Sequence, residues 1–162
     1  MTDLDIELEH MLLEINAQRW PQLERFFFSY FCYREGFVTH KGKPDWEAAR
    51  SRTPHSVEVT SSGDGVLEPI VPLQVVIGEI KRYWRDGQLT PSSLQRILDG
   101  LLHYANISKH ELTALKQAGL ANAMPAYWYQ STDKLPLTRF QQLSIKLNGD
   151  ASESWPSVFE AQ

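Results

Sequence analysis

Two carboxylates and a lysine follow one another in the middle of the chain, in an order that could hold a magnesium ion. Asp64 lies fifteen residues before Glu79, and Lys81 follows Glu79 after one intervening residue. Two carboxylates can bind Mg²⁺, and a lysine beside them can steer water or a phosphate group. This chemistry requires the mostly apolar residues 75–80 to form a strand that ends near Glu79.

The order Asp64, Glu79, Lys81 resembles the core of metal-dependent nucleases of the PD-(D/E)xK kind. The resemblance implies a Mg²⁺-dependent nuclease as one alternative function. The same segment also fits a helix that begins after Pro72, because proline is favoured at the start of a helix. In that helix Glu79 and Lys81 are simply solvated. The pattern of residues 73–81 leaves helix and strand open, and the nuclease interpretation depends on the strand.

Other motifs for metal, phosphate or nucleophilic chemistry do not occur in the sequence. The five histidines are spread along the chain, and there is no Cys-x-x-Cys or His-Glu-x-x-His spacing. Gly-rich phosphate loops and a Gly-x-Ser-x-Gly motif are also missing. The single cysteine, Cys32, follows a run of phenylalanines, where a thiol is usually buried with a raised pKa. We therefore expect no metal, no cofactor and no catalytic residue, which favours a protein that is not an enzyme.

Residues 91–118 are predicted to form two helices joined by a short link, which resembles a helix-turn-helix unit. Thr90 followed by Pro91 begins the first helix, and Ser108 with Glu111 has capping-box spacing at the start of the second. A DNA-binding regulator is therefore the first alternative function, and an ordinary helical hairpin is the competing interpretation. The side chains that would contact DNA are Lys109, His110, Lys116, Gln117 and Arg96.

Tryptophan and tyrosine side chains exceed what the predicted core needs, and such residues are enriched where proteins bind one another. Our leading prediction is a non-enzymatic protein–protein interaction module, such as an adaptor, an inhibitor, an immunity-type protein or a regulatory factor. A protein partner is expected first, and a nucleic acid second. The oligomeric state stays open. The residues expected to contact the partner are Tyr127, Trp128, Arg82 and Arg85.

Apolar residues at steps of three and four predict helices over most of the chain, and these helices must position the candidate residues. The predicted fold is mainly α, a single-domain bundle of about five helices with a short irregular or β segment in the middle. Residues 1–149 form this domain, with possible divisions at 1–35, 36–71 and 72–149. A short strand is predicted at residues 55–60. Residues 150–162 are expected to be a flexible acidic tail.

The 162 residues carry a formal net charge of −4, which argues against a basic nucleic-acid coat protein. The charge is uneven, because residues 72–149 hold nine basic and five acidic side chains and the segments around them are acidic. One cysteine excludes an intrachain disulfide. The acidic start and the short apolar runs indicate neither a secretory signal nor a membrane span, so we expect a cytoplasmic protein with no membrane partner.

Overall fold

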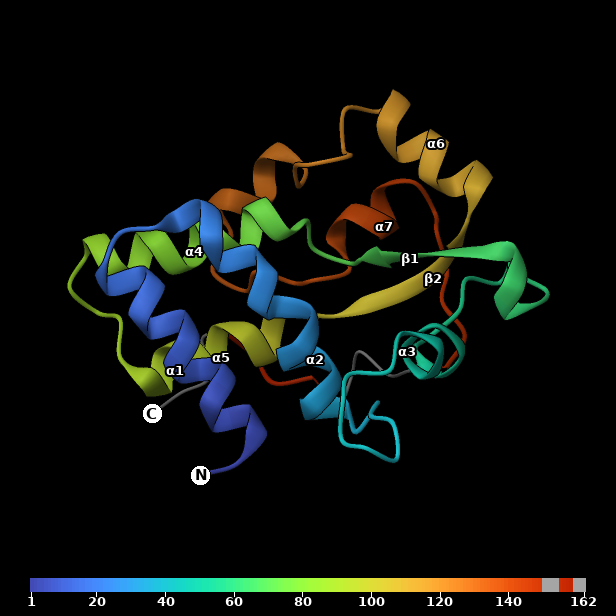
Figure 1. The fold of residues 1–162 in the computed structure, drawn as a ribbon. Coiled ribbons are helices and arrows are strands. Elements are labelled where there is room, and N and C mark those ends of the chain that lie inside the picture. The colour runs from blue at the N-terminus through green and yellow to red at the C-terminus, as the bar shows by residue number, and fades with distance from the viewer. Residues whose placement is uncertain (150–154, 159–162) are drawn as a thin grey trace.

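The computed structural model describes residues 1–149 and 155–158, and these residues form seven α-helices and one two-stranded antiparallel sheet. The prediction of a mainly α fold with a short β segment is confirmed. In Figure 1 the helices α1, α4 and α5 lie at one side, and the sheet lies with α3, α6 and α7 at the other. No helix in the described part of the chain is long and apolar enough to span a membrane.

The first 35 residues form two helices with a tighter segment between them. Helix α1 (Asp3–Asn16) begins at a capping box made by Thr2 and Asp5. The 3₁₀ helix η1 (Trp20–Phe26) starts beside Pro21, and α2 (Phe27–Glu35) ends at Gly36, whose φ of 78° favours glycine. The helices α1 and α2 are therefore separated at residues 17–26, around Pro21.

The middle segment contains α3 (Trp46–Arg52), η2 (Ser62–Asp64) and strand β1 (Gly65–Pro69). The strand predicted at residues 55–60 is wrong in extent. Only isolated bridges occur there, from His55 to Asn106 and from Ser56 to Leu147. The strand forms a few residues later, where Gly65 pairs with Ser108. Position 65 suits glycine, because a side chain there would collide with Asn106.

Residues 73–85 form a helix, which decides the choice that the sequence left open. Helix α4 (Leu73–Arg85) follows Pro72, and α5 (Pro91–Leu101) begins at Thr90, whose side chain accepts a hydrogen bond from the Ser93 amide. Strand β2 (Tyr104–Ser108) comes next and pairs with β1, and α6 (Lys109–Gln117) starts at the capping box of Ser108 and Glu111.

The last part of the described chain consists of short elements. The 3₁₀ helix η3 (Ala126–Gln130) precedes α7 (Thr138–Gln142), which ends before the positive φ of Ser144. Residues 150–154 and 159–162 of the predicted flexible tail lie outside the described residues. Residues 155–158 pack on the body, where Val158 is buried and its carbonyl accepts a hydrogen bond from Arg96.

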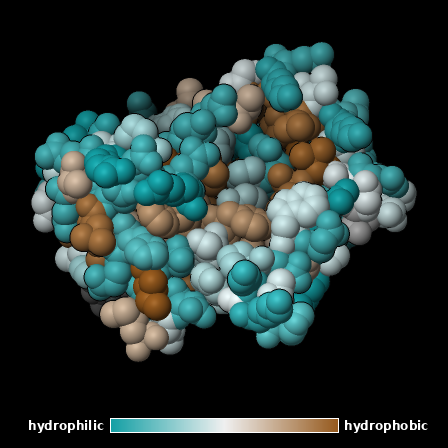
Figure 2. Space-filling model, in the orientation of Figure 1, coloured by the Kyte–Doolittle hydropathy of each residue, from teal (hydrophilic) through white to brown (hydrophobic). Residues whose placement is uncertain are grey.

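Buried apolar side chains form two clusters. The helical cluster is built mainly from α1, α2, α4 and α5, with Phe27, Ile80 and Leu98 fully buried. The sheet cluster gathers residues of β2, α6 and α7, among them Ile107, Leu115 and Phe140. Hydrophilic side chains cover most of the face seen in Figure 2, and smaller apolar groups reach the surface near a central hollow.

Candidate functional site

Two of the predicted partner-binding residues share a surface with an exposed aromatic side chain. Arg82 and Arg85 lie on α4, and Tyr129 lies on η3. A groove of about 370 Å³ lies between these elements, lined also by Gln74, Val75, Gly78, Glu79 and Asn122. Tyr127, on the same 3₁₀ helix, is 61% exposed and lies outside the lining of this groove. We refer to Arg82, Arg85, Tyr127 and Tyr129 as the α4–η3 surface.

The two arginines of this surface differ in their partners. Arg82 forms an ion pair with the nearly buried Glu79, and this hydrogen bond raises the pKa of Arg82. Arg85 is exposed and has no ion pair or hydrogen bond from its side chain among the described residues. The Glu79–Arg82 pair therefore neutralises itself, and Arg85 supplies the net positive charge of the groove.

Trp128, the fourth residue expected to contact a partner, is buried and does not belong to the exposed part of this surface. The residue is 1% exposed, and its indole N–H donates a hydrogen bond of 2.9 Å to the Leu135 carbonyl. Lys134 donates to the carbonyls of Trp128 and Tyr129, and burial lowers the pKa of Lys134. These contacts fix η3 in a position where Tyr127 and Tyr129 face outward. The alternation of Tyr, Trp and Tyr in the sequence was the available signal for this arrangement.

The residues proposed for DNA contact do not form a helix-turn-helix-like pair. Strand β2 separates α5 from α6, and the two helices lie apart in Figure 1. Lys109, His110, Lys116 and Gln117 are exposed on α6. His110 lies 3.3 Å from Glu58, while Arg96 on α5 uses its Nε–H to bind the Val158 carbonyl.

The residues of the nuclease interpretation are not brought together. Glu79 and Lys81 lie on a helix instead of a strand, and Asp64 lies in η2, at the opposite end of the molecule from α4 in Figure 1. Glu79 is paired with Arg82, and the Lys81 ammonium lies over the Trp20 ring. Within the described residues, no group of three His, Cys, Asp or Glu side chains could hold a metal ion.

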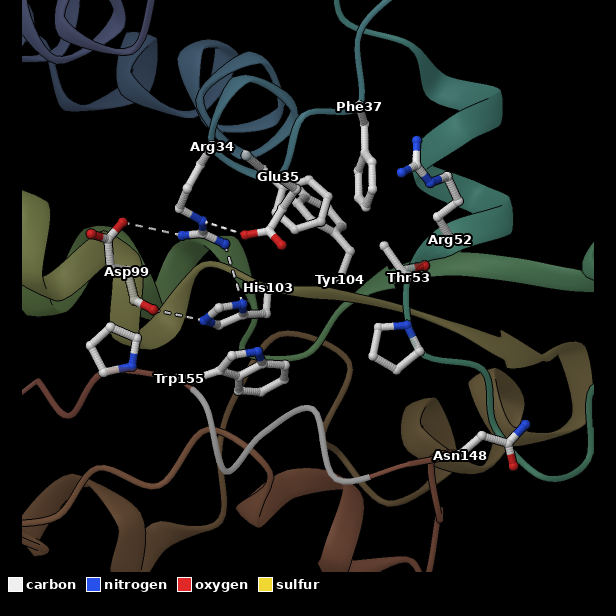
Figure 3. Close-up of a pocket in the computed structure, with 13 residues that line it drawn as sticks. Arg34, Glu35, Phe37, Arg52, Thr53, Asp99, His103, Tyr104, Asn148 and Trp155 are labelled. Atoms are coloured by element: carbon white, nitrogen blue, oxygen red, sulfur yellow. Dashed lines mark hydrogen bonds and ion pairs between the residues drawn. The ribbon is translucent and has the colours of Figure 1, made fainter.

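A second candidate site, which the sequence did not reveal, is a cleft of about 520 Å³ (Figure 3). It lies where the end of α2 meets α3, the start of β2 and residues 155–156. Phe31, Phe37, Tyr104 and Trp155 line it with aromatic rings, and Arg34, Glu35, Arg52 and Asp99 line it with charges. We call it the ring-lined cleft.

Arg34 anchors one wall of this cleft with all of its N–H groups. Its Nε donates to Glu35 at 2.8 Å, and one terminal nitrogen donates to the Leu98 carbonyl and to Asp99. The other terminal nitrogen donates to the Leu102 carbonyl and to Nδ1 of His103. Five N–H donors are the full capacity of a guanidinium group, so Arg34 has none left for a ligand.

His103 is held neutral beside Arg34. Its Nε2 lies 2.8 Å from the Asp99 carbonyl, which can only accept, so Nε2 carries the proton and Nδ1 accepts from Arg34. Burial, together with the charge of Arg34, lowers the pKa of His103 to about 3. Trp155 stacks on the imidazole ring with 3.8 Å between centroids. His103 is therefore neither an acid nor a metal ligand near neutral pH.

Cys32 has the packing role that the sequence predicts. The side chain is fully buried in the helical cluster, and burial raises the pKa of its thiol to about 11. The thiolate, which is the nucleophile, is therefore scarce at neutral pH.

Comparison of the chain with models of protein families, with curated proteins and with solved structures finds no match. The fold and the two sites describe a small helical protein with one cationic aromatic surface and one ring-lined cleft.

Proposed function

We propose that this chain is a non-enzymatic protein–protein interaction module that binds an acidic segment of a partner through the α4–η3 surface. The observation that carries the proposal is an unpaired arginine, Arg85, beside a groove that is also lined by the half-exposed ring of Tyr129. Arginine and tyrosine are among the residues that contribute most to binding energy at protein interfaces.

The rings give this surface apolar contact area without leaving polar atoms unsatisfied. The Tyr129 hydroxyl accepts a hydrogen bond of 3.0 Å from the Met124 amide, and the Tyr127 hydroxyl lies 3.3 Å from Gln142. Each ring is thus held in place before a partner arrives, which lowers the entropy lost on binding.

Charge selects the class of partner. Residues 72–149 carry nine basic and five acidic side chains, and Arg85 is the member of the groove that is not neutralised by a neighbour among the described residues. An acidic segment would gain a charge-assisted hydrogen bond from Arg85 and apolar contact with the tyrosine rings. Adaptors, inhibitors, immunity-type proteins and regulatory factors can all act in this way.

The test is affinity capture from native lysate with matched variants. We expect one protein with an acidic segment, identified by mass spectrometry, to bind the wild-type chain and to weaken by about tenfold with Arg85→Glu or Tyr127→Ala. Lys109→Glu, which makes the same charge change on α6, is the control and should bind normally. Binding should also weaken as salt is added.

Two outcomes would overturn the proposal. One is a captured partner that binds Arg85→Glu and Tyr127→Ala as well as it binds the wild type. The other is retention of a DNA duplex at low salt that is lost with Lys109→Glu and not with Arg85→Glu, which would assign the function to α6.

A further inference from the structure

The ring-lined cleft has two charged groups whose hydrogen-bonding capacity is not used by the described residues. The Arg52 guanidinium lies 5.3 Å from the centre of the Phe37 ring, and it makes no ion pair or hydrogen bond with the described part of the chain. Glu35 accepts from Arg34 through Oε2, which leaves its other oxygen, Oε1, without a donor in the same set of residues. A ligand could therefore find one free donor group and one free acceptor.

These two groups lie on opposite sides of the Phe37 ring, as Figure 3 shows. On the side of Glu35, the single positive charge of Arg34 meets two carboxylates, Glu35 and Asp99, so that wall is negative by one charge. On the other side, Arg52 is a lone positive charge among Thr53 and Pro54. A ligand that satisfies both walls needs an anionic and a cationic group in one small molecule.

The remaining lining selects a ligand with an aromatic ring. Phe31, Phe37 and Tyr104 form a connected group of rings, with centroid distances of 5.7 Å from Phe31 to Phe37 and 4.7 Å from Phe31 to Tyr104. Trp155 closes the cleft from below in Figure 3. The cleft volume of about 520 Å³ lies in the range of small-molecule sites.

We propose that the ring-lined cleft binds a free aromatic α-amino acid. The Arg52 guanidinium holds the carboxylate of the ligand, the Glu35 carboxylate holds its ammonium group, and the aromatic lining receives its side chain. Arg34 does not touch the ligand in this arrangement, because its donors are already used; it positions Glu35. The site shares no residue with the α4–η3 surface.

The first arm of the test varies the ligand, so it does not depend on how a variant folds. Titrations of the wild-type protein with L-phenylalanine, L-tyrosine and L-tryptophan are followed by chemical-shift changes of backbone amides. We expect saturable shifts in residues that line the cleft. The analogues 3-phenylpropanoate, which lacks the ammonium group, and 2-phenylethylamine, which lacks the carboxylate, should each bind at least about tenfold more weakly.

The second arm removes each charge of the protein. Arg52→Gln and Glu35→Gln should each weaken binding of the best amino acid by about tenfold or more. Lys41→Gln and Glu47→Gln are matched controls, because both residues are exposed nearby and neither lines the cleft. The controls should bind as the wild type does.

The proposal is overturned if none of the three amino acids gives a saturable shift at about 10 mM, well above a weak dissociation constant. It is also overturned if 3-phenylpropanoate binds within about threefold of phenylalanine and Glu35→Gln has no effect, since the cleft would then be a simple anion site. The proposal is likewise overturned if 2-phenylethylamine binds within about threefold of phenylalanine and Arg52→Gln has no effect, since the cleft would then be a simple cation site.

Discussion

His103 is nearly buried and uses both ring nitrogens in hydrogen bonds. Protonation of its ring would break the hydrogen bond from Arg34 and is therefore unfavourable. Its pKa falls from the ordinary 6.5 to about 3 in the folded chain. Between these values the unfolded chain binds a proton that the folded protein does not bind. The stabilisation is therefore complete above pH 6.5 and is lost as the pH falls towards 3.

We expect His103→Gln to flatten this dependence. In urea unfolding between pH 7 and pH 4, the wild type should lose up to about 1.4 kcal/mol per pH unit more than the variant does. His40→Gln removes an exposed histidine and serves as the control. Equal slopes for the wild type and His103→Gln would show that His103 titrates normally in the folded state.

The sequence predicts some single residues of the sites and misses others for a physical reason. Arg82 and Arg85 could be selected because they lie in the basic segment formed by residues 72–149. Arg34 and Arg52 could not, because what distinguishes them is tertiary. Apart from Glu35, the partners of Arg34 lie more than sixty residues away, on and after α5. Arg52 is distinguished by the Phe37 ring beside its guanidinium.

At the scale of elements, two helical glycines provide a matched comparison. A Cβ atom at Gly78 on α4 would meet nothing within 4 Å, whereas one at Gly100 on α5 would lie 2.7 Å from a Val158 methyl and 3.0 Å from the Pro156 carbonyl. Alanine is the better helix former by about 0.5–1 kcal/mol at both positions. Of these two glycines, only Gly100 is packed so closely against another segment that a larger residue would collide with it.

We expect Gly78→Ala to raise the free energy of unfolding by about 0.5–1 kcal/mol. Gly100→Ala should lower it by about 1 kcal/mol or more, because the backbone of residues 156–158 must move away. Hydrogen exchange followed by mass spectrometry should show faster exchange of the C-terminal peptide in Gly100→Ala alone. A stabilised Gly100→Ala with unchanged exchange would contradict the packing of this segment on α5.

The helices were predictable because their signals are local. Thr90 with Ser93, and Ser108 with Glu111, mark the starts of α5 and α6 within three residues. The sheet was not predictable in the same way, because β1 pairs with a strand about forty residues later. Four of the five residues of β2 are buried, so the alternation that reveals a half-exposed strand is absent.

At the scale of the whole molecule, Arg139 ties the last helix to the sheet. Its side chain is fully buried and donates to the carbonyls of Ile70, Pro69 and Leu120 and to the Glu68 carboxylate at 3.0 Å. Burial lowers the pKa of Arg139 and raises that of Glu68, and their attraction opposes both effects. One side chain thus joins β1, the segment at Leu120 that follows α6, and α7.

We expect Arg139→Leu to lower the free energy of unfolding by about 3–5 kcal/mol, because it leaves Glu68 and several backbone carbonyls without their donor. The double variant Arg139→Leu/Glu68→Leu should recover part of the loss, since it removes the unpaired carboxylate. Urea unfolding measures both changes, and Lys109→Leu on the surface should change stability by less than about 0.5 kcal/mol. A loss below about 1 kcal/mol for Arg139→Leu would show that α7 is held by its apolar contacts alone.

The buried thiol of Cys32 can also report how often the native protein opens. Its thiol is the one cysteine of the chain and has no exposed surface, so a maleimide reaches it only when the helical cluster separates. The rate of alkylation of the unmodified protein therefore reports how often that cluster opens in the native state. Such labelling of the purified protein needs no engineered probe, because Cys32 on α2 is the one thiol of the chain.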